Sequence, residues 1–177
     1  MNVCVFCGSS AGKNSLYAHS ARELGELLAK DGHTLIFGGG NIGLMGILAD
    51  AVLINGGKAI GVIPDFLMKK EVGHNGLTTL EVVSSMHERK RRMADLADAF
   101  LVIPGGWGTL DETAEILTWR QLGLIQQPVG LLNINGFFDL LIAQMNHMVR
   151  EGFLNQDNMD FVKVDKTPEA VLQKLSS

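Results

Sequence analysis

The chain has 177 residues, which is within the usual range for one domain, and its hydrophobic content of 46% is enough to fill a sizeable core. Its net charge of -4 argues against a nucleic-acid surface, although RKRR at 89–92 is a local basic cluster. The sequence opens without the pattern of a signal peptide, and no run approaches the roughly 18 apolar residues of a membrane span, so we expect one domain (1–177), cytoplasmic, without nucleic-acid or membrane partners.

Short β-branched runs alternate with longer runs of helical periodicity along the chain. The pattern predicts strands at 2–7, 33–37, 59–63, 80–84, 99–103, 128–133 and 161–165. It predicts helices at about 15–30, 43–55, 86–98, 109–123, 136–150 and 167–175. This alternation is typical of an α/β fold, namely a Rossmann-like, doubly wound parallel sheet with helices on both faces. The longest irregular segment, 64–76, is predicted to be a lid or an edge.

Two glycine-rich segments each lie between a predicted strand and a predicted helix. They are FGGGNIGLMG at 37–46 and PGGWGTLDE at 104–112. Glycine lets the backbone come close to a ligand, and the first N–H groups of a helix have no intrahelical partner, so each segment is a candidate phosphate site. Such loops lie together at the carboxyl ends of parallel strands, so the two predict a single crevice of nucleotide size.

Other motif patterns compete with this interpretation. Gly38, Gly40 and Gly43 satisfy GxGxxG, with Asp65 as a later acidic residue, but a dinucleotide fingerprint usually opens the first βα unit and here it follows the second strand. The segment 9–15 nearly matches a P-loop. Cys7, however, stands where that motif needs glycine, and Asn14 where it needs serine or threonine.

Cys4 and Cys7 form a CxxC pattern within one predicted strand. Three residues of strand put them about 10 Å apart, which is too far for a disulfide. The chain has 2 cysteines, so none is left to complete a zinc site. We expect two thiols packed in or near the core.

Thr109 and Glu112 have two interpretations. Their TxxE spacing is that of a capping box, in which both side chains satisfy the first turn of a helix. Alternatively, Glu112 projects beside a bound sugar while backbone amides hold the phosphate. A carboxylate next to the phosphate itself would be repelled, so its useful place is one sugar away.

The segment SMHERKRRM at 85–93 begins a predicted helix with a basic face. We interpret Lys90, Arg91 and Arg92 as solvated. Arg89 differs, because it shares a helix face with Met86 and Met93 and is therefore expected to be partly buried. A buried arginine needs an anionic partner such as a carboxylate or a phosphate.

Four segments, CVFCGSS, FGGGNIGLMG, MHERK and PGGWGTLDE, together resemble the LOG (Lonely Guy) family of cytokinin riboside 5'-monophosphate phosphoribohydrolases. The resemblance spans nearly the whole chain and includes TWRQLG, PVGLLN and EGF. It implies hydrolysis of the N-glycosidic bond of a purine nucleoside 5'-monophosphate, giving the free base and ribose 5-phosphate, with no metal or organic cofactor.

The resemblance also implies the site residues and the assembly. The family's catalytic pair falls on Arg89 and Glu112. Substrate contacts fall on Glu71, Lys90, Gly106, Trp107, Gly108, Thr109, Leu110, Asp111 and Thr118. A homodimer with sites near its interface is implied, and the predicted helix with Trp119, Leu122 and Leu124 is a candidate contact surface.

The chain departs from the family pattern in two places. It reads GLIQQPVG where members often carry a histidine and a lysine, and Trp107 stands where tyrosine is common. These changes leave the identity of the base open. A non-catalytic nucleotide sensor of the same fold is an alternative function. An older name for such sequences, lysine decarboxylase, would need a lysine that carries pyridoxal phosphate, and the sequence marks no such site.

Overall fold

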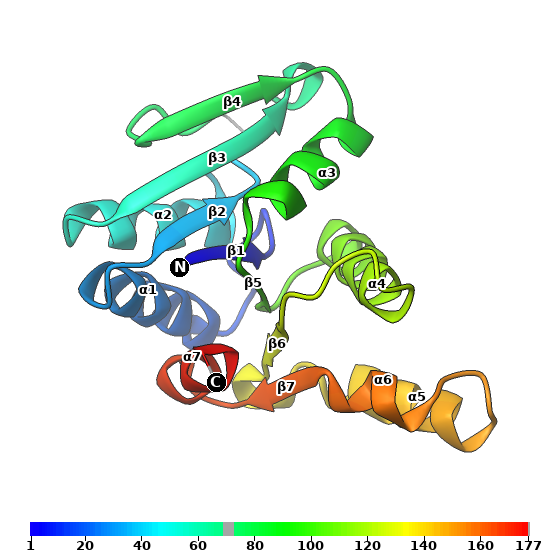
Figure 1. Cartoon of the computed structure of the whole chain (residues 1–177). Coiled ribbons are helices and arrows are strands. Elements are labelled where there is room, and N and C mark those ends of the chain that lie inside the picture. Colours follow the sequence, from blue (N-terminus) through cyan, green and yellow to red (C-terminus); the bar gives the residue numbers. More distant parts are fainter. Residues whose placement is uncertain (69–72, 177) are drawn as a thin grey trace.

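The computed structural model describes residues 1–68 and 73–176. Within this part of the chain a seven-stranded parallel sheet has the order β4-β3-β2-β1-β5-β6-β7 (Figure 1). Its strands are β1 (Asn2–Phe6), β2 (Thr34–Phe37), β3 (Lys58–Pro64), β4 (Thr79–Val83), β5 (Ala99–Val102), β6 (Val129–Leu132) and β7 (Val162–Asp165). All seven predicted strands are present, and the predicted doubly wound α/β class is confirmed.

The α-helices of the described residues are α1 (Ser15–Lys30), α2 (Gly43–Ile54), α3 (Met86–Leu96), α4 (Trp107–Gln121), α5 (Asp139–Arg150), α6 (Gln156–Asp160) and α7 (Pro168–Ser176). Short 3-10 turns occupy Asp65–Leu67 and Ile134–Gly136. Sequence patterns missed α6, because five residues with one apolar side chain carry no helical periodicity. No helix that the structure describes is long and apolar enough to cross a membrane.

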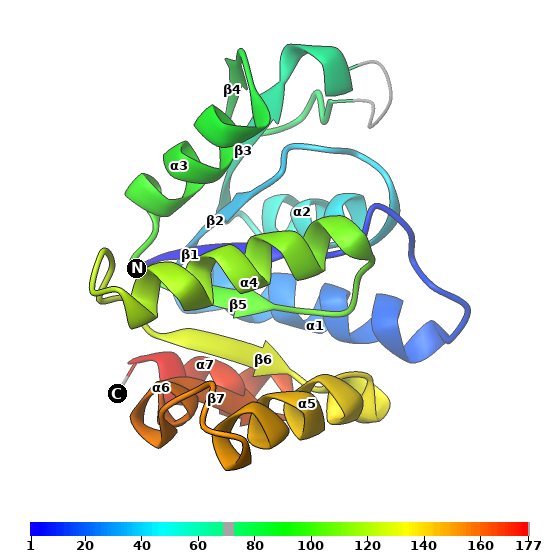
Figure 2. The same ribbon diagram turned by 90° about the vertical axis from the view of Figure 1, so that its right-hand side faces the viewer.

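Helices cover both faces of the sheet, and each face has its own core (Figure 2). Successive side chains of β1 point to opposite faces of the sheet and so enter different cores. Val3 and Val5 pack under α1, α2 and α7. Cys4 and Phe6 pack under α3, α4 and α5. Each fully buried Leu, Ile, Val or Phe side chain contributes about 1.5–3 kcal/mol by leaving water. The sheet is therefore a rigid base for the loops at its edge.

Cys4 and Cys7 are both buried, and neither forms a disulfide. Cys4 belongs to the core on one face of the sheet and Cys7 to the core on the other. Their expected state as two packed thiols without a disulfide is therefore confirmed.

The direction of chain progression reverses at β1, which lies between β2 and β5. The N–H of Gly8, just after β1, donates to the carbonyl oxygen of Pro104, just after β5, at 3.1 Å. The N–H of Leu44 at the start of α2 donates to the carbonyl oxygen of Gly8 at 3.0 Å. Three loops thus meet at the carboxyl ends of the central strands, where ligands bind in folds of this kind.

Candidate active site

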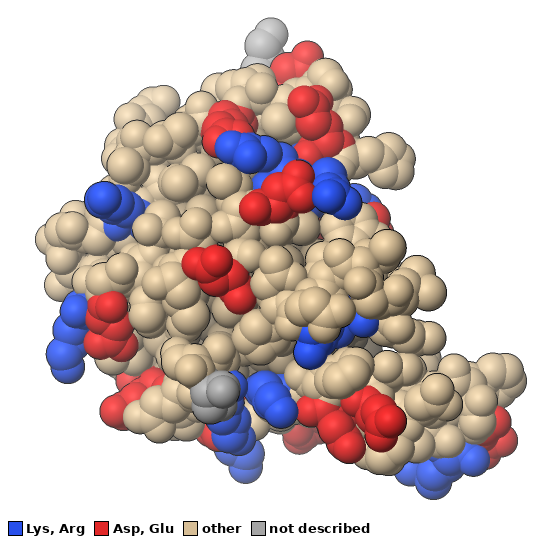
Figure 3. Space-filling view, viewed as in Figure 1, with Lys and Arg blue, Asp and Glu red and all other residues tan. Residues whose placement is uncertain are grey.

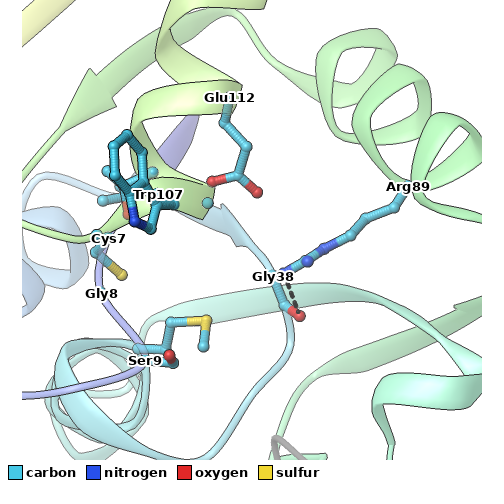
Figure 4. Close-up of a pocket in the computed structure, with 12 residues that line it drawn as sticks. Cys7, Gly8, Ser9, Gly38, Arg89, Trp107 and Glu112 are labelled. Carbon is cyan, nitrogen blue, oxygen red and sulfur yellow. Dashed lines mark hydrogen bonds between the residues drawn. The ribbon is translucent and has the colours of Figure 1, made fainter.

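A cavity of about 150 Å³ lies at this switch point (Figure 4). Its walls come from the loop after β1, the loop after β2, helix α3 and the start of α4. The lining residues are Val5, Cys7, Gly8, Ser9, Gly38, Met45, Arg89, Gly106, Trp107, Gly108, Thr109 and Glu112. The two glycine segments therefore share one cavity, as predicted.

The first turn of α4 forms one wall of this cavity. The helix begins at Trp107 rather than at residue 109, and its N-cap is Gly106, which makes no side-chain capping bond. The capping-box interpretation is wrong, because Thr109 already lies inside the helix and Glu112 lies beyond its first turn. A Cβ on Gly105 would overlap the Thr109 hydroxyl, so glycine is required for the backbone to approach the helix. The backbone amides of the first turn are thereby presented to the cavity.

Arg89 is the first buried residue of α3 and is 5% exposed. Its Nε donates to the carbonyl oxygen of Val62 on β3, and its Nη2 donates to that of Gly38, both at 3.1 Å. These bonds fix the plane of the guanidinium at the cavity wall. The expected burial of Arg89 is confirmed, and backbone carbonyls hold it from the β2–β3 side.

Glu112 is 8% exposed and comes from α4, on the wall facing Arg89. Figure 4 shows both side chains directed into the cavity from different helices. Burial raises the pKa of the Cys4 thiol, and the negative charge of Glu112 raises it further while Arg89 lowers it. The charges of Glu112 and Arg89 therefore both reach Cys4 in the sheet beneath the cavity. The net shift of its pKa is upward, so the Cys4 thiol stays protonated.

Lys90 lies outside the cavity lining, where it joins α3 to α4. Its Nζ lies 3.1 Å from Oδ2 of Asp111 and 3.1 Å from Oε2 of Glu115, and its side chain is 12% exposed. Burial lowers the pKa of Lys90, but the hydrogen bonds to both carboxylates outweigh it, so the net shift is upward. The interpretation of Lys90 as a solvated residue is therefore wrong. Its ion pairs fix the two helices that carry Arg89 and Glu112.

The rest of the basic cluster is more exposed and is also paired. Arg91 bonds to Asp95 one turn later on α3, and Arg92 forms a two-bonded pair with Glu81 on β4. On the face seen in Figure 3, Lys and Arg side chains lie among Asp and Glu side chains rather than in one patch.

The other predicted contacts lie away from the cavity or outside the described residues. Leu110 and Thr118 line a separate apolar groove of about 470 Å³ between α4, α5, α6 and β7. Thr118 lies nine residues after Thr109, about 14 Å farther along the helix. Glu71, and with it part of the expected lid or edge at 64–76, falls outside the residues that the structure describes.

Sequence reasoning did not assign roles to several lining residues, among them Val5, Cys7, Gly8, Ser9 and Met45. The signal was present in CVFCGSS, since a segment directly after the first strand of a doubly wound sheet reaches its switch point. It lacks the run of glycines that marks the other two loops, so its pattern alone does not indicate a binding site.

Comparison with known proteins identifies the family. A family model described as "Possible lysine decarboxylase" matches residues 45–175. The cytokinin riboside 5'-monophosphate phosphoribohydrolase LOG of Oryza sativa subsp. japonica is 44% identical over 173 residues, covering 98% of this chain and 72% of the relative. The chain belongs to the LOG family. LOG3 of Arabidopsis thaliana, which carries the same enzyme name, is 42% identical over 173 residues, 98% of this chain and 80% of its own.

Solved structures agree on the fold of this LOG-family chain. The molybdenum cofactor carrier protein of Chlamydomonas reinhardtii superposes with a TM-score of 0.75, at 21% identity over 99% of this chain and 97% of its own. The molybdenum cofactor binding protein of Rippkaea orientalis gives 0.69 at 23% identity over 99% and 94%. At these identities the likeness shows the fold alone.

The description of the family model suggests a decarboxylase, for which the cavity is poorly suited. Pyridoxal phosphate would need a lysine amine to form its Schiff base. The described residues that line the cavity include no lysine. Lys90, which follows the lining residue Arg89 in the sequence, forms ion pairs with Asp111 and Glu115.

Proposed function

We propose that this LOG-family protein hydrolyses the N-glycosidic bond of cytokinin riboside 5'-monophosphates, and of AMP, to release the free base and ribose 5-phosphate. The observation that carries the proposal is the meeting of Arg89, Glu112 and the first turn of α4 in one cavity. Curated relatives that are 42% to 44% identical carry the name of this activity and support it.

The 5'-phosphate binds at the start of α4. The amides of Gly106, Trp107 and Gly108 lie where a helix leaves its N–H groups without intrahelical partners, and the helix dipole adds a partial positive charge there. Gly108 presents its backbone with open space around its Cα, which lets a phosphate approach closely.

Glu112 acts at the ribose, one helical turn farther into the cavity. Breaking the bond between C1' and the base nitrogen develops positive charge on the sugar, and a buried carboxylate stabilises that charge. The same carboxylate orients the water that attacks C1'. The hydroxyl of the water ends on C1', its proton goes to the departing base, and neither a metal nor an organic cofactor takes part.

Arg89 positions these groups. Its guanidinium is fixed by the carbonyls of Val62 and Gly38, so it holds Glu112 and the nucleotide in register without reorganising during the reaction. Lys90 and Asp111 act indirectly, because their ion pair sets the spacing of α3 and α4, the helices that carry Arg89 and Glu112.

The active protein is a homodimer. A cavity of about 150 Å³ encloses only part of a nucleotide, since ligand pockets measure roughly 300–1,000 Å³. Thr118 lies too far along α4 to contact a ligand in its own cavity, so its substrate contact is made in the site of a second chain. The apolar groove beside Thr118 and the exposed Leu122 and Leu124 give that second chain a surface to pack on.

The test is to incubate the purified protein with isopentenyladenosine 5'-monophosphate and to quantify free base and ribose 5-phosphate by chromatography. The proposal predicts both products in a 1:1 ratio. Saturable binding of the monophosphate without release of base would instead establish the nucleotide sensor. Release of base together with ribose 1,5-bisphosphate in phosphate buffer would indicate phosphorolysis and would also contradict the proposal.

A further inference from the structure

His74 is a buried titratable residue to which none of the roles above is assigned. It is 6% exposed and lies between β3 and β4. Its Nε2 lies 3.0 Å from Oδ1 of Asp50 on α2, and its Nδ1 accepts the N–H of Gly76 at 3.1 Å. Because Nδ1 accepts a hydrogen bond, the ring proton of neutral His74 is on Nε2 and is donated to Asp50. The ring therefore ties residues 74–76 to α2.

The backbone next to this ring is paired with the glycine loop after β2. The N–H of His74 donates to the carbonyl oxygen of Gly39 at 3.0 Å, and Gly40 forms an antiparallel bridge with Gly73. Since α2 begins at Gly43, the loop is held at both ends: by the backbone of residues 73–74 and, through Asp50, by the helix that follows it.

This loop also holds Arg89, because the carbonyl of Gly38 accepts from Nη2 of Arg89 at 3.1 Å. Gly38 is so close to that nitrogen that a Cβ would overlap it. We propose that His74 is a positioning residue, which fixes the 38–40 loop through Asp50 and Gly76 and so sets the guanidinium of Arg89. The inference rests on the proposed function only in that Arg89 acts on the bound nucleotide.

Two substitutions test separately the hydrogen bonds that the His74 ring forms with Asp50 and Gly76. His74→Gln places an amide N–H near the position of Nε2 and keeps the bond to Asp50, whereas His74→Asn keeps an acceptor near Nδ1 and loses that bond. Small displacements of a catalytic group cost up to about 100-fold in rate. We therefore expect His74→Asn to lower kcat about 10- to 100-fold with little change in KM, and His74→Gln to restore much of the loss. His147→Asn, at an exposed position of α5, is the matched control and should leave kcat unchanged.

A double-mutant cycle with Arg89→Lys distinguishes positioning from a general effect on folding. If His74 acts through Arg89, His74→Asn should lower kcat less than about twofold in the Arg89→Lys background. An undiminished loss of activity in that background, with the thermal unfolding midpoint unchanged, would overturn the inference.

A second readout does not depend on activity. The Nε–H signal of Arg89 in an NMR spectrum, assigned through Arg89→Lys, reports its bond to Val62 directly. We expect His74→Asn to shift this signal and to speed its exchange with solvent, while His147→Asn does neither. An unaltered signal in His74→Asn would overturn the positioning role, whereas absence of base release by the unsubstituted protein would contradict only the proposed function.

Discussion

The guanidinium of Arg89 and the backbone of Gly38 are in direct contact across 51 positions of sequence, with 3.1 Å between Nη2 and the carbonyl oxygen. A Cβ at position 38 would overlap this nitrogen and lie 3.1 Å from Cζ of the same side chain. The glycine is therefore required for the approach of a charged side chain to the cavity wall, and the contact links two of the four segments that form this wall, the loop after β2 and α3.

Gly38→Ala is expected to fold and to lose activity. The new methyl group meets the movable end of an arginine rather than fixed backbone, so Arg89 is displaced while the sheet remains intact. We expect kcat to fall by at least about tenfold, up to about 100-fold, with circular dichroism unchanged. Steady-state kinetics of base release give the answer, and a variant with normal kcat would show that the position of Arg89 is unimportant.

Glu112→Gln tests the charge at the ribose. The substitution keeps the size and hydrogen-bonding capacity of the side chain and removes the negative charge that stabilises the developing cation. We expect kcat to fall by about 100- to 1,000-fold or more, with binding of AMP retained. Rapid-quench assays together with calorimetric binding separate the two effects. Near-normal turnover would leave Glu112 with a structural role only.

The sequence predicted the strands and the position of the crevice because both depend on local patterns, β-branched runs and glycine turns, in a fold with few allowed connections. It predicted the start of α4 poorly. TxxE fits a capping box at Thr109, whereas the close packing of Gly105 on Thr109 places the helix start at Trp107, and this packing is a tertiary contact.

The pairing of Lys90 was also beyond the sequence pattern. Periodicity places Lys90 on the polar side of α3, but Asp111 and Glu115 come from a helix whose position depends on the whole sheet. Equally, the resemblance transferred Thr118 to the site, whereas the structure of one chain places it in a separate groove. Only the arrangement in space distinguishes a contact within one chain from a contact between two.

The pair of Glu81 and Arg92 predicts a pH-dependent contribution to stability. The hydrogen bonds from Arg92 lower the pKa of Glu81, and burial opposes the shift. The unfolded chain, with a glutamate pKa of about 4.3, then binds more protons than the folded chain as the pH falls. The stabilisation is present at pH values above the unfolded glutamate pKa. It is lost as the pH drops through the lower pKa that Glu81 has in the folded chain.

The matched variant is Glu81→Gln. We expect it to lower the free energy of unfolding by up to about 1 kcal/mol at pH 7, because the pair is partly exposed. The difference from the unsubstituted protein should shrink progressively in urea titrations as the pH falls below the unfolded glutamate pKa of about 4.3. A difference that stays constant from pH 7 to pH 3 would exclude this ion pair as its cause.

The proposed dimer predicts a specific disruption. Met148 lines the apolar groove beside Thr118 and is 39% exposed. Met148→Glu would bury a charge in the interface, so we expect size-exclusion chromatography with light scattering to show a monomer. We also expect the activity of this variant to be much reduced. Ile54→Glu, at a site on α2 that is 83% exposed, is the control and should remain dimeric. A monomeric unsubstituted protein at micromolar concentration would contradict the dimer.

We propose that the start of α4 binds a 5'-phosphate while Glu112 acts at the ribose. The most direct test is the ratio of kcat/KM for AMP to kcat/KM for adenosine. The two substrates share the bond that breaks and differ only in the phosphate. Because remote binding energy positions the reacting carbon, we expect adenosine to react at least about 1,000-fold less efficiently. Equal turnover of AMP and adenosine would contradict the proposal.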